Sequence, residues 1–180
     1  IGLLYVKEHH ECDAVLVLDA DGEDTPEGAV KLIHTFSNLG KAVFAQRSRR
    51  TESFAFRLFY RFYRALHLLL TGLAVRVGNF SILPASYLST LSVMPELWNH
   101  YAAAVFRSRL PYSMVPIARG RRIAGQSTMN FVALISHGLS AISVYGDVVG
   151  VRLLIASLIG SMVAALAAVA VIGIRVFTNL

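Results

Sequence analysis

The chain has 180 residues, of which 55% are hydrophobic and 16% are charged, and its formal net charge is +6. The length suits one domain, but the hydrophobic fraction is too high for an ordinary soluble protein. The positive charge favours anionic partners such as phosphorylated substrates or an acidic membrane surface. The single cysteine, Cys12, excludes an internal disulfide, and a zinc site with His9 and His10 matches no standard ligand spacing.

The first predicted elements are a short helix at the start of the chain and a buried strand at the apolar run 15–18. A cluster of carboxylates that includes Asp19 and Asp21 follows directly. Pro26 then opens an amphipathic helix over residues 28–36, because proline is favoured in the first helical turn. Open α/β sheets bind ligands at the carboxyl ends of their strands, so this cluster lies where a ligand is expected.

The spacing of the carboxylates indicates a metal site. Asp19 and Asp21 are two residues apart, so in extended backbone both side chains leave the same face. Such a pair suits Mg²⁺ or Mn²⁺, which takes its other ligands from water and substrate phosphates. A solvated acidic turn that caps the next helix remains the alternative. An EF-hand loop is excluded, because its sixth position would be Asp24 and its twelfth Val30.

A basic, aromatic helix is predicted over residues 54–67, after a second strand at 42–46. Arg57, Arg61 and Arg64 recur at i, i+4 and i+7, so they share one stripe of the helix. Such a stripe could bind a nucleic-acid strand, but contact with anionic lipid headgroups fits better beside a membrane anchor. No nucleic-acid partner is therefore expected. A merely solvated face stays open for Arg61 and Arg64.

The middle of the chain is predicted to form a strand or loop at 77–84, a helix at 96–107 and a cationic loop at 116–127. The loop carries three arginines within the four residues from Arg119 to Arg122. Guanidinium groups bind phosphate oxygens through two parallel hydrogen bonds. We therefore expect this loop to bind an anion.

Two apolar segments end the chain. Residues 153–174 carry no charge, and at about 1.5 Å per residue they span roughly 33 Å, enough for a transmembrane helix. The excess of Lys and Arg before this helix places the rest of the chain on the cytoplasmic side. Its small residues suit packing between membrane helices and leave a homo-oligomer open.

The other apolar segment, residues 129–145, is short and contains several polar residues. We expect a helix, broken near Gly138, that lies in the membrane interface or against the transmembrane segment, with Leu134 and Ile142 on its lipid side. A full membrane span is the alternative. His137 is interpreted as an uncharged core or interfacial side chain instead of a metal ligand.

The order of these features resembles family 2 glycosyltransferases of the polyprenyl-phosphate sugar synthase type, the dolichyl-phosphate mannose synthase group. The similarity extends over roughly residues 5–175. The motifs that carry it are Asp-Ala-Asp and Pro-Glu within residues 19–27, Gln-Arg47-Ser, the basic aromatic helix, Gly78-Asn79-Phe80, and Arg122-x-x-Gly-x-Ser127. Thr128 departs from the pattern, because these enzymes often have Lys there. The βαβ portion that normally grips the nucleotide is expected to precede Ile1.

The resemblance implies an α/β fold of the GT-A, Rossmann-like type. Residues 1–128 would be the C-terminal part of the glycosyltransferase domain. Residues 129–147 would form the interfacial helix region, and residues 148–180 a transmembrane helix with its flank. The implied activity is an inverting transfer of a sugar from a nucleotide-sugar donor to a polyprenyl phosphate or another membrane lipid.

The same resemblance implies a metal site on the donor diphosphate. Asp19, Asp21 and Glu23 would hold Mg²⁺ or Mn²⁺, with Asp21 also counted among the catalytic residues.

Basic residues would surround the donor and acceptor phosphates. Arg57 and Arg122 would take part in catalysis, while Arg47, Arg122 and Ser127 would bind the donor. An acceptor phosphate is already ionised near neutral pH, so no strong general base is required.

Three other functions are alternatives to this one. A processive polysaccharide synthase would carry Gln-x-x-Arg-Trp before its membrane segments, whereas the only tryptophan here is Trp98. A family 2 enzyme with a different membrane acceptor retains every feature. A non-catalytic, membrane-anchored binding protein would keep the fold, although it has no physical need for two converging carboxylates.

Overall fold

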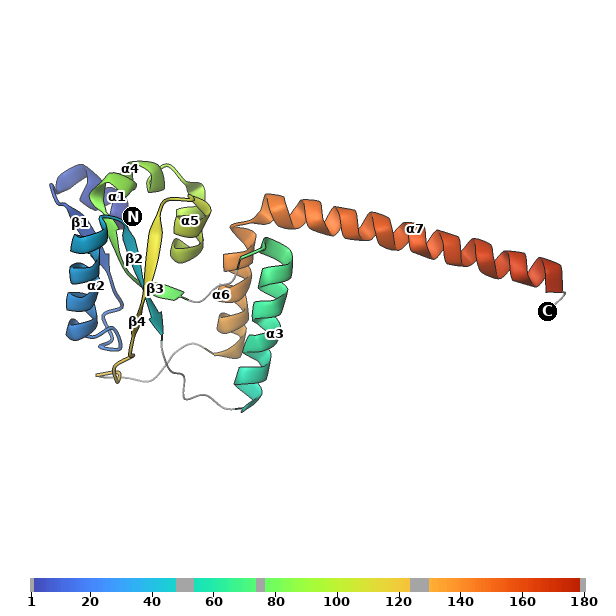
Figure 1. Cartoon of the computed structure of the whole chain (residues 1–180), viewed down its shortest axis with the longest axis horizontal. Coiled ribbons are helices and arrows are strands. Elements are labelled where there is room, and N and C mark those ends of the chain that lie inside the picture. The colour runs from blue at the N-terminus through green and yellow to red at the C-terminus, as the bar shows by residue number, and fades with distance from the viewer. Residues whose placement is uncertain (1, 48–53, 74–76, 124–129, 179–180) are drawn as a thin grey trace. The chain divides into compact units, whose positions relative to one another are not determined.

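The structure is a computed structural model that describes residues 2–47, 54–73, 77–123 and 130–178, with the backbone alone at Arg47 and at residues 54–57 (Figure 1). The chain divides into two compact units, residues 1–144 and 145–180. The first unit contains α1 (Gly2–His9), β1 (Ala14–Val17), α2 (Pro26–Leu39), β2 (Ala42–Arg47), α3 (Phe54–Thr71), β3 (Val77–Pro84), η1 (Ala85–Tyr87), α4 (Leu88–Leu91), η2 (Pro95–Trp98), α5 (Tyr101–Arg107), β4 (Tyr112–Ile117) and α6 (Phe131–Ser143). The second unit consists of α7 (Gly146–Thr178).

The four strands form one mixed sheet in the order β1-β3-β2-β4. Strand β3 is antiparallel to both of its neighbours, while β2 and β4 are parallel. Strands β1, β2 and β4 therefore point the same way, and their carboxyl ends lie at one edge of the sheet, called the carboxyl edge below. The register pairs Val17 with Ser81 and Arg47 with Ile117. This arrangement confirms the predicted α/β fold.

The sheet is covered on both faces because alternate residues of its central strands point in opposite directions. Val43 and Ala45 of β2 pack with Leu32 of α2 on one face. Ala42 and Phe44 pack on the other face with residues of α4 and α5. Both clusters are dominated by fully buried aliphatic and aromatic side chains, so the strands are held firmly in register.

Helix α2 begins and ends at the residues that cap it. Thr25 caps its N-terminus, with its Oγ1 accepting a hydrogen bond from Gly28 N at 3.1 Å. Pro26 occupies the first turn as predicted, and Gly40 ends the helix in the left-handed conformation at φ 63°. The helix extends three residues beyond its predicted end at Phe36.

Two predictions about the middle of the chain are wrong. Residues 96–107 do not form one helix, because His100 is extended and caps α5, its Nδ1 accepting from Ala103 N at 3.2 Å. Residues 116 and 117 belong to β4 and not to a loop. Proline is tolerated there because β4 is an edge strand.

Helices α3 and α6 contact each other, and the predicted break near Gly138 is absent. A Cβ at Gly138 would lie 2.8 Å from the ring of Tyr63, so glycine here permits close packing instead of a kink. The Tyr63 hydroxyl donates to the Gly138 carbonyl at 3.1 Å. Ile142 is buried, which corrects its placement on a lipid side, whereas Leu139 is exposed.

Helix α7 contains the predicted span of residues 153–174 and continues beyond it at both ends. Within the described residues it is the one helix long and apolar enough to cross a membrane. Its 33 residues correspond to about 50 Å, more than the roughly 30 Å of a hydrocarbon core.

The core of the sheet yields a matched prediction on α2. Leu32→Ala should lower the free energy of unfolding by about 2–5 kcal/mol, because Leu32 is fully buried against β2. Leu39→Ala, on the same helix but 47% exposed, should change it by no more than about 0.5 kcal/mol. Urea unfolding in detergent, followed by Trp98 fluorescence, measures both. Equal losses in the two variants would contradict this packing.

Candidate functional site

The loop after β1, residues 18–25, is called the acidic loop. Side-chain carboxylates within this loop accept hydrogen bonds from its own backbone. Asp21 Oδ1 accepts from the backbone N–H of Glu23 at 3.0 Å, and Asp24 Oδ2 accepts from the backbone N–H of Asp19 at 2.9 Å. Short polar side chains favour such turns because they replace backbone acceptors. The acidic residues are therefore held at the carboxyl edge.

The loop after β4, residues 118–123, is called the cationic loop. Its backbone is joined to that of the acidic loop, although the two are far apart in the sequence. The Gly120 N–H donates to the Glu23 carbonyl at 2.9 Å, and the Ile123 N–H donates to the Asp21 carbonyl at 3.0 Å. These two bonds fix the loops side by side.

Ion pairs add to this backbone contact. Arg122 Nη2 lies 2.8 Å from Asp21 Oδ2, and Arg122 Nε lies 3.7 Å from Glu23 Oε1. Arg119 forms a second ion pair with Glu23, whose side chain is only 15% exposed. Two carboxylates and two guanidinium groups thus neutralise one another at the carboxyl edge. The sequence predicted an acidic metal site and a cationic anion site, but not their pairing.

Two glycines permit the close approach of the loops. A Cβ at Gly120 would lie 2.6 Å from Thr25 Cγ2 and 2.9 Å from the carbonyl oxygen of Gly22. Gly22 itself has φ +83°, and a Cβ there would meet Ile123 at 2.3 Å. Side chains at either position would push the loops apart.

Little space remains beneath the paired loops. A cavity of about 10 Å³, large enough for about one water molecule, is bordered by Glu23, Arg119 and the start of β3 at Gly78. A ligand that approached Glu23 from this space would therefore have to displace Arg119 from it.

The remaining predicted site residues lie at different places. Arg47 ends β2 at the carboxyl edge, opposite Ile117, and Arg57 lies in the first turn of α3; the side chains of both arginines are outside the description. Ser127 lies outside the described residues. Asp19 is exposed on the acidic loop. Within the described part of the chain, no group of three or more His, Cys, Asp or Glu side chains could hold a metal ion.

The sequence did not indicate a pair of hydroxyl groups behind this edge. The hydroxyl groups of Ser81 and Tyr101 lie 2.7 Å apart, and Ser81 Oγ also donates to the Asn79 carbonyl at 2.8 Å. Burial raises the pKa of Tyr101, so it stays protonated. The pair joins β3 to α5 at the point where β3 lies beside the end of β1, because Ser81 is the register partner of Val17. The Gly78-Asn79-Phe80 motif was the only signal in this region.

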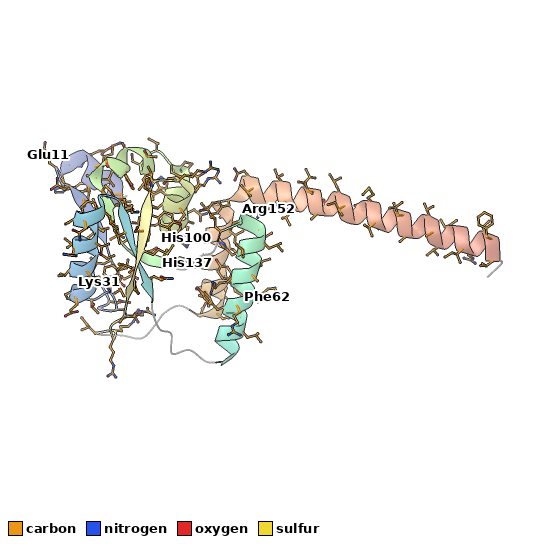
Figure 2. The ribbon with its side chains drawn as sticks, viewed as in Figure 1. Glu11, Lys31, Phe62, His100, His137 and Arg152 are labelled. Carbon is orange, nitrogen blue, oxygen red and sulfur yellow. The ribbon has the colours of Figure 1, made fainter. Side chains whose placement is uncertain are left out.

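His137 has a histidine partner. Its ring lies 4.5 Å from that of His100, centroid to centroid, where α6 meets the N-terminus of α5 (Figure 2). Burial, together with the neighbouring His137, lowers the pKa of His100 to about 4. A neutral His100 is what its cap requires, since a protonated Nδ1 could not accept from Ala103 N.

No protein-family model matches the chain, and no curated protein matches it.

The close contact between the two loops predicts that a methyl group added at Gly120 destabilises the fold. Gly120→Ala should lower the free energy of unfolding by about 1–3 kcal/mol, because its Cβ would meet the fixed carbonyl of Gly22. Gly2→Ala is the control, since nothing lies within 4 Å of a Cβ at that position. Thermal melting in detergent compares the two. A Gly120→Ala variant as stable as the wild type would show that the loops are not held together.

The cap of α5 predicts a pH dependence. The pKa of His100 falls from 6.5 to about 4 on folding, so between these pH values the unfolded chain takes up a proton that the folded chain does not. The melting temperature should therefore fall as the pH is lowered from 6.5 to 4, and then level off. His100→Asn retains a cap that does not titrate, and its curve should be flatter. Parallel curves for the two proteins would contradict the role of His100.

Proposed function

We propose that this protein is a metal-dependent family 2 glycosyltransferase with a GT-A fold. It would move a sugar, with inversion, from a nucleotide-sugar donor to a polyprenyl phosphate or another membrane lipid. The observation that carries the proposal is the meeting of the acidic and cationic loops at the carboxyl edge of an α/β sheet. Open α/β sheets bind their ligands at this edge.

The charges at the site support a donor of this class. Asp21 and Glu23 are paired with Arg122 and Arg119. A nucleotide diphosphate with its divalent ion offers the same two types of charge. On binding, each carboxylate would exchange a guanidinium group for the ion, and each arginine would exchange a carboxylate for a phosphate. Every half-buried charge would then keep a partner of opposite charge. A half-buried charge without such a partner would cost free energy.

The donor atoms of the acidic loop suit Mg²⁺ or Mn²⁺, because all of them are carboxylate oxygens. Asp19 and Asp21 would hold the ion, with Glu23 beside them; one or two protein carboxylates suffice when substrate phosphates complete the ligand set. The bound ion would act as a Lewis acid on the departing diphosphate. Arg122 would stabilise the negative charge that develops there.

Helices α3 and α6 support a lipid acceptor. Both expose large apolar side chains, among them Leu58 on α3 and Phe131, Val132 and Leu139 on α6. Phe62 of α3 is exposed as well (Figure 2). Arg61 is also exposed on α3. Apolar groups mixed with arginine are typical of helices that lie in the interface of an anionic membrane. Together with α7, they favour an integral membrane protein whose site faces the headgroups.

A non-catalytic, membrane-anchored binding protein is the second candidate. The space for about one water beneath the loops favours it, because mutually neutralised loops could serve as a structural contact alone.

The test is a transfer assay in membranes that contain the protein, with a panel of labelled sugar nucleotides and extraction of lipid-linked product. We expect metal-dependent product with the wild type. Asp21→Asn should reduce turnover by roughly 100- to 1000-fold, the usual effect of removing one electrostatic element. Asp13→Asn is the control, because Asp13 is exposed just before β1, at the opposite end of the strand from the acidic loop.

Three outcomes separate the candidates. Loss of activity in the Asp21→Asn variant, with activity retained in the Asp13→Asn control, supports the transferase. Donor binding without any product supports the binding protein. Activity that survives both chelation of divalent ions and Asp21→Asn contradicts the metal assignment.

A further inference from the structure

Trp98 is the one tryptophan of the chain, and its side chain is 64% exposed at the end of η2. Tryptophan is enriched at interfaces, where its ring lies against apolar groups while its N–H stays hydrated. We propose that Trp98 lies in the headgroup layer of the membrane that α7 crosses and anchors the first unit to that surface. This inference rests on α7 crossing a membrane and does not depend on transferase activity.

The contacts of the next residue place Trp98 close to the last turn of α6. Asn99 Nδ2 donates to Ser143 Oγ at 2.6 Å and to the Ser140 carbonyl at 3.2 Å. Ser143 is the last residue of α6, and α7 begins at Gly146. Three residues of chain reach about 11 Å at most. A short stretch of chain therefore tethers the region of Trp98 to the start of α7.

The start of α7 belongs at headgroup depth. Its charge-free run begins at Leu153, after Asp147 and Arg152 in the first turns. Charged residues at the end of a long apolar helix stay in the polar layer, while the apolar run enters the hydrocarbon. The residues before Leu153, and the side chains tethered to them, are thus kept at the membrane surface.

The surroundings of Trp98 suit lipid. Indole prefers the interface because its ring is apolar while its N–H can still donate to headgroups or water. Glu96, the acidic residue of η2, is paired with Arg107 at 3.1 Å, so it does not repel anionic lipids. Apolar side chains are exposed on both meeting elements, Trp98 on η2 and Leu139 on α6.

The single tryptophan makes fluorescence specific for this site. The whole chain is reconstituted in phosphatidylcholine–phosphatidylglycerol vesicles, with or without bromine on the lipid acyl chains, and insertion is checked by flotation after an alkaline wash. We expect Trp98 emission at a shorter wavelength than indole in water. We also expect brominated lipids to lower its intensity by about two-fold or more, and aqueous iodide to have little effect.

The control moves the tryptophan to the sheet-covering helix. Trp98→Phe combined with Val30→Trp places it at an exposed position of α2. This variant should be quenched by iodide and not by brominated lipids. Floating wild-type protein that behaves like the control overturns the proposal. So does Trp98 protected from both quenchers, which indicates a protein partner or a second copy. Failure of the protein to float with the vesicles also overturns the proposal, because α7 is then not inserted in a membrane. The proposed transferase activity is tested by its own assay, so the two proposals can fail independently.

Discussion

The pairing of the acidic and cationic loops is the contact on which the candidate site depends. Strands β1 and β4 are the two outer strands of the sheet, so their loops can meet only by crossing over the carboxyl edge between them. Two backbone hydrogen bonds and the ion pair of Asp21 with Arg122 hold them there. The glycines at positions 22 and 120 give the necessary space. Gly78, near the start of the inner strand β3, borders the small space beneath these loops.

The elements predicted correctly are those with local causes. Pro26, with Thr25 as the cap, starts α2, and the apolar run before Asp19 forms β1. The pairing of Asp21 with Arg122 could not be predicted in the same way, because it follows from strand order, which no local pattern encodes. The same holds for β4, where an edge position makes Pro116 acceptable. The division of the 96–107 segment escaped prediction because histidine is an uncommon cap.

Hydropathy alone could not say what covers an apolar segment. The sequence predicted Ile142 on a lipid side, yet it is buried, and Gly138 packs against Tyr63. A helix of 13 residues is too short to span a membrane, so its apolar side can be covered by protein, by lipid or by both. Here the two sides differ: Gly138 and Ile142 face protein, while Leu139 stays exposed.

The ion pairs also bear on how a donor would bind under the proposed function. Each pair is part-buried, so the cost of desolvating its charges offsets much of their mutual attraction, whereas micromolar binding of a ligand corresponds to about 8 kcal/mol. A donor that carries both charge types can therefore displace them. A divalent ion alone would leave Arg122 and Arg119 without carboxylates, and a diphosphate alone would leave Asp21 and Glu23 without cations. Each would bind more weakly without the other, so the self-neutralised loops favour the ion and the diphosphate as a unit.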